Sequence, residues 1–167
     1  MRVPRIGPAR AGLSIARLSA LHYTCKIRRP FFEEVVRLAN QRQCDLVAIT
    51  GDLLDKSDLV SWLPATLGRL RAPLGVYCVL GNHDRRVNVA RLRDMLAELE
   101  IQMLGGRAVE LQHRGARFVL AGNELPWFRP AAEFPLQTEL PAGEPLRILL
   151  SHSPDQIHGA RRRGFDL

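Results

Sequence analysis

Residues 46–55 read LVAITGDLLD and residues 76–84 read VYCVLGNHD, and these two stretches decide the fold class. Each begins with a short apolar run and ends at a glycine followed by polar residues. Runs of this kind predict buried strands, over residues 46–50 and 76–80. The residues between them, 57–70, are mostly helical in pattern, with a break expected at Pro64. Strands joined by helical crossovers form parallel sheets, so the sequence predicts an α/β fold.

The same alternation of strand and helix extends outward from these stretches. The predicted strands cover residues 13–19, 46–50, 76–80, 108–112, 116–121 and 147–151, and a further strand begins at 165–167. The predicted helices cover residues 30–43, 57–70, 88–100 and 153–163. Asn88 and Ser153 are the expected N-caps of the last two helices. Arg114-Gly115 is the expected turn of a hairpin, and Gly164 is the expected end of the last helix.

The length of 167 residues suggests one domain, spanning residues 1–167. Hydrophobic residues make up 46% of the chain and charged residues 25%, which is ordinary for a globular protein. No apolar run reaches the roughly 18 residues that a transmembrane helix needs. Residues 1–12 lack the apolar stretch of a signal peptide. The expected location is therefore cytoplasmic, and peripheral attachment to a membrane stays open.

Positive charge dominates, with 24 Lys and Arg against 17 Asp and Glu, a formal net charge of +7. A basic balance suits nucleic acid, anionic lipid or phosphorylated substrates. The arginines are spread along the chain and no aromatic residues interleave with them, as a groove for single strands would need. This favours a solvated surface over a nucleic-acid site, and an anionic membrane surface stays open as a partner. The three cysteines are widely spaced, which argues against a disulfide framework or a structural zinc site.

Polar side chains follow four of the predicted strands at the point where each strand ends. His22 follows the first strand, Asp52 the second, and His152 the strand over 147–151; Asn82, His83 and Asp84 follow the third. Each has a structural explanation of its own, such as a surface histidine or a turn-forming Asp or Asn. In a parallel sheet, however, the carboxyl ends of the strands share one edge, where ligands bind. We therefore expect these side chains to converge.

Mixed carboxylate, amide and imidazole ligands suit Mn, Fe or Zn. Asp52 can bridge two metals, and two metals about 3.5–4 Å apart can stabilise the attacking and leaving oxygens of a displacement at phosphorus. They also lower the pKa of a shared water molecule. His83 is expected to bind the phosphoryl oxygen or protonate the leaving group, and Asp84 is expected to orient His83 and raise its pKa.

In this order, the motifs resemble those of the calcineurin-like metallophosphoesterases: D-x-H, G-D-x-x-D, G-N-H-[DE], a later histidine and G-H-x-H. Residues 51–55 match the second motif, residues 81–84 the third, and residues 149–155 resemble the block around the later histidine. The resemblance implies two sheets packed face to face between helices. It also implies hydrolysis of a phosphate monoester, diester or pyrophosphate with two divalent metal ions.

The resemblance also assigns roles to individual residues. His22 would bind the first metal, Asp52 would bridge, and Asn82 and His152 would bind the second. His83 would be the catalytic histidine, and Asp55 would support the site. The block around His152 and the segment 121–128 are similar to a bacterial subgroup that is often membrane-associated and includes enzymes of lipid-linked pyrophosphates.

Two features depart from the family pattern. Ala20 stands where the aspartate of D-x-H belongs, and residues 1–167 contain no G-H-x-H. The expectations are a domain that is incomplete at its C-terminus and lacks the last strands, at most one well-bound metal, and weak turnover. Two alternatives stay open: an impaired remnant of the fold that acts as a binding protein, and a metallo-nuclease. Salt-dependent DNA binding would identify the latter.

Overall fold

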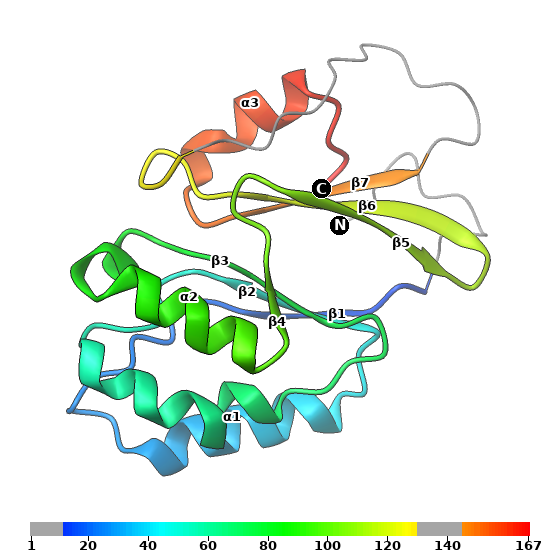
Figure 1. The fold of residues 1–167 in the computed structure, drawn as a ribbon. Helices are drawn as coiled ribbons and strands as arrows, with labels where there is room; N and C mark the ends of the chain where they lie inside the picture. Colours follow the sequence, from blue (N-terminus) through cyan, green and yellow to red (C-terminus); the bar gives the residue numbers. More distant parts are fainter. Residues whose placement is uncertain (1–11, 130–144) are drawn as a thin grey trace.

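The computed structural model describes residues 12–129 and 145–167, whose strands form two sheets (Figure 1). The first sheet has the order β1-β2-β3-β4, and all of its pairs are parallel. The second has the order β5-β6-β7, in which β5 and β6 are antiparallel and β6 and β7 parallel. The strands are β1 (Ile15–Leu18), β2 (Leu46–Thr50), β3 (Val76–Val79), β4 (Ile101–Met103), β5 (Ala108–His113), β6 (Ala116–Asn123) and β7 (Leu146–Ser151).

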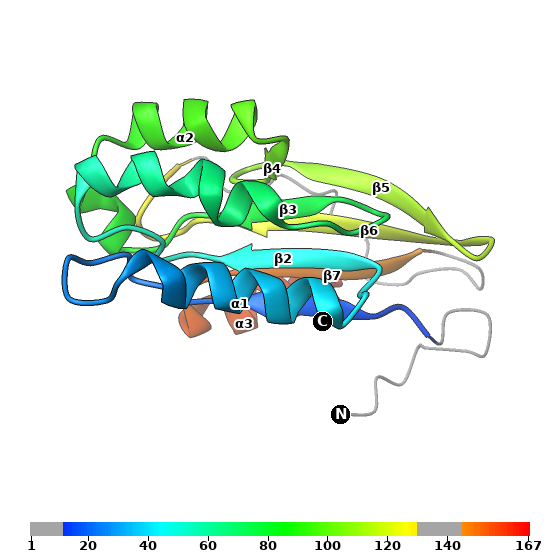
Figure 2. The ribbon, with the colours of Figure 1, turned by 90° about the horizontal axis from the view of Figure 1, so that it is seen from below.

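Helices cover the outer faces of the two sheets, as Figures 1 and 2 show. Helices α1 (Arg29–Gln41) and α2 (Val89–Glu98) lie on the first sheet, and α3 (Ile157–Arg162) lies on the second. Short 3₁₀ segments cover Ser57–Ala65, Leu67–Arg69, His83–Arg86 and Pro154–Gln156. The predicted α/β fold, a sandwich of two sheets flanked by helices, is confirmed.

Two apolar clusters hold these layers together, and β2 contributes to both. Val47 and Ile49 pack with the helices, whereas Leu46 and Ala48 pack against the second sheet. All five residues of β2 are buried because the strand is covered on both faces. The uninterrupted apolar run LVAIT is the sequence signature of this position.

Most predicted elements are present, with three differences. Residues 57–70 are helical but 3₁₀ in type, and the break falls at Thr66, not at Pro64. Strand β4 was not predicted, because its three residues directly follow a helix and are too few to show a period. Ser153 lies at the predicted N-cap position, before the turn Pro154–Gln156, but makes no side-chain capping bond, whereas the Asn88 side chain accepts from the Arg91 N–H at 3.0 Å.

Residues 165–167, where the sequence predicts the start of a strand, are not a strand, but they run alongside β7. The N–H of Leu149 donates to the carbonyl of Leu167 at 2.8 Å, and the N–H of Asp166 donates to the carbonyl of Arg147 at 2.9 Å. Gly164 has φ +75°, which fits its predicted place at the helix end.

Asp45 ties the start of β1 to the start of β2. Its Oδ2 accepts from the N–H of Ser14 at 2.8 Å and from the Ser14 hydroxyl at 2.6 Å. These bonds hold the pKa of the Asp45 carboxyl below its usual value.

Replacing Asp45 by asparagine should lower the free energy of unfolding by about 1 kcal/mol at pH 7. Because the folded-state pKa is lowered, the ionised carboxylate stabilises the fold above the unfolded pKa of about 4 and loses this effect as the pH falls. Urea denaturation from neutral to acidic pH should therefore show the two proteins converging. Glu98→Gln, at an exposed position on α2, serves as the control; a difference that persists in acid would contradict the prediction.

Candidate metal centre

Four loops bring the predicted site residues to one edge of the sandwich. His22 follows β1, Asp52 follows β2, Asn82 and His83 follow β3, and His152 follows β7. The first three loops come together because β1, β2 and β3 are parallel neighbours. The fourth comes from the second sheet and meets them across the interface. The expected convergence is therefore observed, while the roles of these residues as ligands stay predictions.

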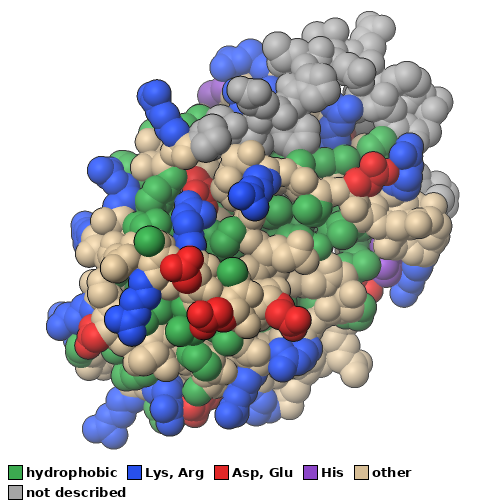
Figure 3. All heavy atoms as spheres, in the orientation of Figure 1, with side chains coloured by type: hydrophobic (Ala, Val, Ile, Leu, Met, Phe, Trp, Pro, Cys, Tyr) green, Lys and Arg blue, Asp and Glu red, His purple; other side chains and the backbone are tan. Residues whose placement is uncertain are grey.

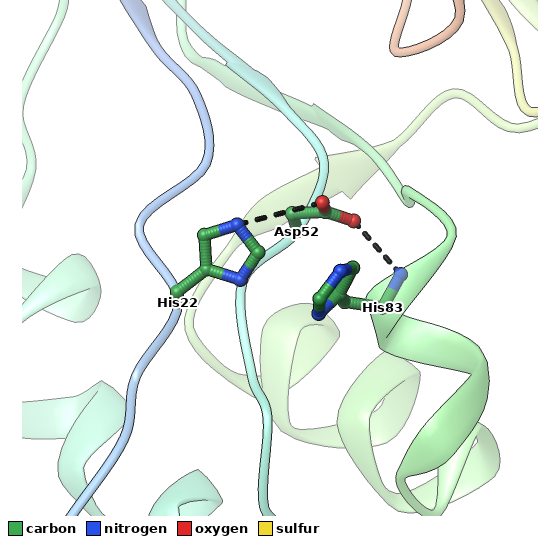
Figure 4. Close-up of side chains that lie close together, drawn as sticks. All are labelled: His22, Asp52 and His83. Carbon is green, nitrogen blue, oxygen red and sulfur yellow. Dashed lines mark hydrogen bonds and ion pairs between the residues drawn. The ribbon is translucent and has the colours of Figure 1, made fainter.

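Asp52 lies at the centre of the group and its side chain is only 7% exposed. Its Oδ2 lies 3.6 Å from Nε2 of His22 and 3.4 Å from Nε2 of His152. Its Oδ1 accepts a hydrogen bond from the N–H of His83 at 2.9 Å, and Figure 4 shows Asp52 between the two histidines His22 and His83. One carboxylate oxygen thus faces two imidazoles from different sheets, the position expected of a bridging ligand.

His152 presents a lone pair to this centre. Its Nδ1 lies 2.9 Å from the carbonyl oxygen of Thr50, which can only accept, so Nδ1 carries the hydrogen. In the neutral ring Nε2 then has a lone pair, and it lies 3.0 Å from Oδ1 of Asn82. Asp52 Oδ2 faces the same point, so three acceptor atoms converge. A divalent cation among these atoms would satisfy all three, and the mixed N and O donors fit Mn, Fe or Zn.

Two glycines allow this close packing. A Cβ atom on Gly81 would lie 2.3 Å from Oδ1 of Asp52 and 2.9 Å from Cγ of His152. A Cβ on Gly51 would lie 2.8 Å from Nδ1 of His152, and Gly51 also has φ +82°. The glycine of each motif is therefore required by the close approach of the two loops to each other and to His152.

Asp55 contacts two histidines of the site at once. Its Oδ1 lies 2.8 Å from Nδ1 of His83 and 3.3 Å from Nδ1 of His22. The two rings are 4.5 Å apart in an edge-to-face arrangement. Burial raises the pKa of the Asp55 carboxyl, but the contacts with His83 and His22 outweigh it, so the pKa lies below its usual value. A carboxylate in this position orients the ring of His83.

Asp84 has a different place from the one expected. It is completely buried, and its two oxygens accept from four backbone N–H groups, at 2.8–3.1 Å, which belong to Asp52, Leu53, Leu54 and Gly81. Burial raises its pKa, and the N–H donors oppose this effect. The interpretation that Asp84 orients His83 is therefore corrected, since Asp55 makes that contact. Asp84 instead joins the loops after β2 and β3.

Comparison with known proteins bears on this geometry. The family model of the calcineurin-like phosphoesterases matches residues 15–166. The chain belongs to this family. Its enzymes are hydrolases of phosphate esters that depend on divalent metal ions, so the chemistry expected from the converging ligands agrees with the family.

Three relatives show how far the similarity extends. A transmembrane protein with a metallophosphoesterase domain from Bos taurus is 33% identical over 68% of this chain and 26% of its own. An uncharacterised metallophosphoesterase from Aquifex aeolicus is 30% identical over 64% of this chain and 41% of its own. The UDP-2,3-diacylglucosamine pyrophosphatase LpxG of Chlamydia muridarum is 32% identical over 54% and 28%. The matched region thus spans less than half of each relative's length.

Ala20 occupies the position where calcineurin-like phosphoesterases have an aspartate, and its backbone is in the left-handed region. It is exposed, its N–H donates to the carbonyl of Gly51 at 3.1 Å, and its φ is +52°. Asp and Asn adopt this left-handed region more readily than Ala does. The main chain at Ala20 therefore has the conformation that an aspartate would favour, but it carries a methyl group that cannot bind a metal.

The distances between side-chain atoms would also allow His83 to be a metal ligand. His22, Asp52 and His83 offer potential ligand atoms that all lie within 4.8 Å of one another. His83 is therefore placed close enough to contact a group bound at the centre.

The carbonyl of Thr50 fixes the ring of His152 and was not predicted. No sequence signal could reveal it, because every residue type has the same main-chain carbonyl. No helix in residues 12–129 or 145–167 is long and apolar enough to cross a membrane.

Proposed function

We propose that this chain is a phosphoesterase whose metal position is formed by Asp52, Asn82 and His152. The convergence of three acceptor atoms on one point carries the proposal. A divalent metal at this point would neutralise phosphoryl charge and lower the pKa of water. His22 and Asp52 form a second, weaker position, because Ala20 supplies no ligand there. We expect one well-bound ion, with Mn, Fe and Zn as the candidates.

His83 would act on the substrate in this scheme. With its Nδ1 directed at Asp55, the other ring nitrogen can reach a phosphoryl or leaving-group oxygen. From that nitrogen, His83 would donate a proton to the departing oxygen. Asp52 and His22 hold the loops around this point through the contacts already described. The substrate class would be a phosphate ester or a pyrophosphate, the latter being what the printed name of the LpxG relative states for that protein.

Calorimetric titration with Mn²⁺, together with hydrolysis of p-nitrophenyl phosphate, its bis-ester and pyrophosphate, tests the proposal. We expect binding that His152→Ala weakens and His158→Ala, at an exposed position on α3, leaves unchanged. We also expect Mn²⁺-dependent hydrolysis that His83→Ala abolishes. Absence of saturable Mn²⁺ binding would refute the proposal.

One observation favours a second candidate, a binding protein with little turnover. Ala20 removes a charged ligand from the first metal position, and two-metal hydrolysis needs both ions. This candidate predicts Mn²⁺ binding at the position of His152 without hydrolysis of any of the three substrates. The same titration and assays therefore separate the two functions.

Ala20→Asp is expected to let each chain bind a second Mn²⁺ ion and to raise the rate of hydrolysis at least roughly tenfold. Changes in the residues around a bound metal commonly alter metal affinity or activity 10–100-fold. The added carboxylate would stand beside His22 and Asp52 in a backbone conformation that suits it. The matched control is Ala20→Gly, which accepts φ +52° but offers no ligand. Equal stoichiometry in Ala20→Asp and Ala20→Gly would show that residue 20 does not reach the metal.

A further inference from the structure

We infer that Glu124 is a positioning residue of the metal centre, because its carboxylate connects the second sheet to the loop that carries Asn82 and His83. Glu124 follows β6 and is 3% exposed. It lies in the segment 121–128, but the sequence predicted no role for this residue. The inference rests on the proposed function, since the loop in question supplies one of the proposed ligands and the catalytic histidine.

Two strong interactions satisfy the buried carboxylate. Its Oε1 accepts from the N–H of Leu80 at 2.8 Å, and its Oε2 accepts from Nη2 of Arg93 on α2 at 2.5 Å. Arg93 also lies over the ring of Phe128, with its guanidinium carbon 5.7 Å from the ring centroid. A buried charge is retained only where such partners compensate for its lost hydration. The two interactions therefore hold the Glu124 carboxylate in one position.

Gly105 shows how closely the carboxylate is enclosed. A Cβ atom on Gly105 would lie 2.3 Å from Oε2 of Glu124, so no larger residue fits there. Gly105 also bridges to Gly122 near the end of β6. The main chain of both sheets thus surrounds the side chain of Glu124, which is the arrangement of a fixed support rather than of a surface ion pair.

The bond to Leu80 acts where the loop leaves its strand. β3 ends at Val79, and the next N–H, that of Leu80, is buried and donates to Glu124. The N–H of Gly81 then donates to Asp84, and the N–H of His83 donates to Asp52. Three carboxylates thus hold the main chain from residue 80 to residue 83. Asp52 and Asp84 belong to the first sheet and its loops, whereas Glu124 belongs to the second.

The proposed metal position depends on the distance between the two sheets at this point. Asn82 comes from the first sheet and His152 from the second, and their ligand atoms are 3.0 Å apart. A support that fixes the loop after β3 to the second sheet therefore sets this distance. Without the bond to Leu80, the loop keeps its ties to the first sheet, and the bond between the Thr50 carbonyl and His152 remains as a link to the β7 loop. Asn82 is then held less firmly relative to His152.

The test compares Glu124→Met, which removes the acceptor, with Glu124→Gln, which keeps an acceptor for Leu80 but loses the charge that pairs with Arg93. Glu110→Met is the matched control, because Glu110 also pairs with an arginine, Arg117, but at an exposed position on β5. Val36→Ala, on the buried face of α1, controls for loss of stability alone.

The amide resonances of Asn82 and His83 are recorded first in metal-free protein, and Mn²⁺ affinity is then measured by calorimetry. Glu124→Met should shift both resonances and weaken Mn²⁺ binding roughly 10–100-fold, the size of effect known for residues that orient ligands. Glu124→Gln should fall in between, and both controls should bind Mn²⁺ like the native chain.

Unshifted resonances in Glu124→Met, or Mn²⁺ affinity equal to that of the native chain, would overturn the inference. If the native chain itself binds no Mn²⁺, the proposed function fails, and the resonances of metal-free protein still decide whether Glu124 positions the loop. If Glu124→Met does not fold, Glu124→Gln and Arg93→Met are compared with Arg117→Met in the same two measurements.

Discussion

Asp52→Asn is expected to weaken Mn²⁺ binding at least roughly 100-fold, beyond the 10–100-fold typical of residues that only orient ligands. The reason is geometric. Oδ1 accepts from the N–H of His83, so the amide oxygen of asparagine will take that position. The NH₂ group then replaces Oδ2 and points a donor at His22 and His152, where a metal needs a lone pair. An isosteric change therefore removes the ligand.

This result can be separated from a loss of folding. Asparagine tolerates the φ of +56° at residue 52, so Asp52→Asn should unfold in EDTA close to the native chain. Asp58→Asn, at an exposed position six residues along the chain, is the control for loss of one negative charge. Calorimetry and thermal unfolding give the two readouts. Near-native Mn²⁺ affinity in Asp52→Asn would show that Asp52 is not a ligand.

Asp84→Asn is expected to lower the free energy of unfolding by about 3 kcal/mol, because buried donors left without acceptors cost about 1–3 kcal/mol each. Each oxygen of Asp84 accepts from two N–H groups. Whichever way the amide is turned, its NH₂ group faces two N–H donors. The loss should be present without any metal, since it arises from the junction of the loops after β2 and β3.

Urea denaturation in EDTA measures this effect, with Asp94→Asn as the control on the exposed side of α2. Exposed substitutions of this kind change stability by less than about 0.5 kcal/mol. A native-like unfolding midpoint for Asp84→Asn would mean that the four N–H groups find other acceptors. Metal affinity should also fall, because Asp52 and Gly81 both lie in the loops that Asp84 joins.

Together these predictions distinguish two kinds of acidic residue in the loops after β2 and β3. Asp52 is predicted to bind metal, and its loss should spare the fold. Asp84 holds the main chain, and its loss should destabilise the fold. Figure 3 shows acidic side chains, in red, at the surface on the face seen in Figure 1, where such effects are small. Burial, rather than charge, therefore separates Asp52 and Asp84 from these surface acids.

The roles of these residues were only partly predictable from the sequence. The pairing of Asp55 with His83 and His22 could not be read from the spacing of G-D-x-x-D, because it depends on how the loops after β1, β2 and β3 meet. For the same reason Asp84 was expected next to its sequence neighbour His83. A side chain adjacent in sequence need not point to the same place, and in the 3₁₀ turn of residues 83–86 the two point apart: His83 to the site and Asp84 to the interior.

Local patterns were sufficient for the fold class and for the edge at which the site lies. The apolar runs at 46–50 and 76–80 form the central parallel strands, because a strand covered on both faces must be apolar throughout. The loops after them carry the polar residues, since parallel strands end at one edge. The short β4 escaped prediction because three residues cannot show a period.

What the sequence determined by itself was therefore the central parallel strands, the glycine-polar motifs at their edge and membership in a family of metal-dependent hydrolases. What only the tertiary structure decided was which groups meet: the Thr50 carbonyl with His152, Asp84 with four backbone N–H groups, and Glu124 with Leu80. The physical reason is that strands and turns follow from the preferences of neighbouring residues. Contacts between distant loops follow from the packing of two sheets, and their main-chain donors and acceptors are the same for almost every residue type.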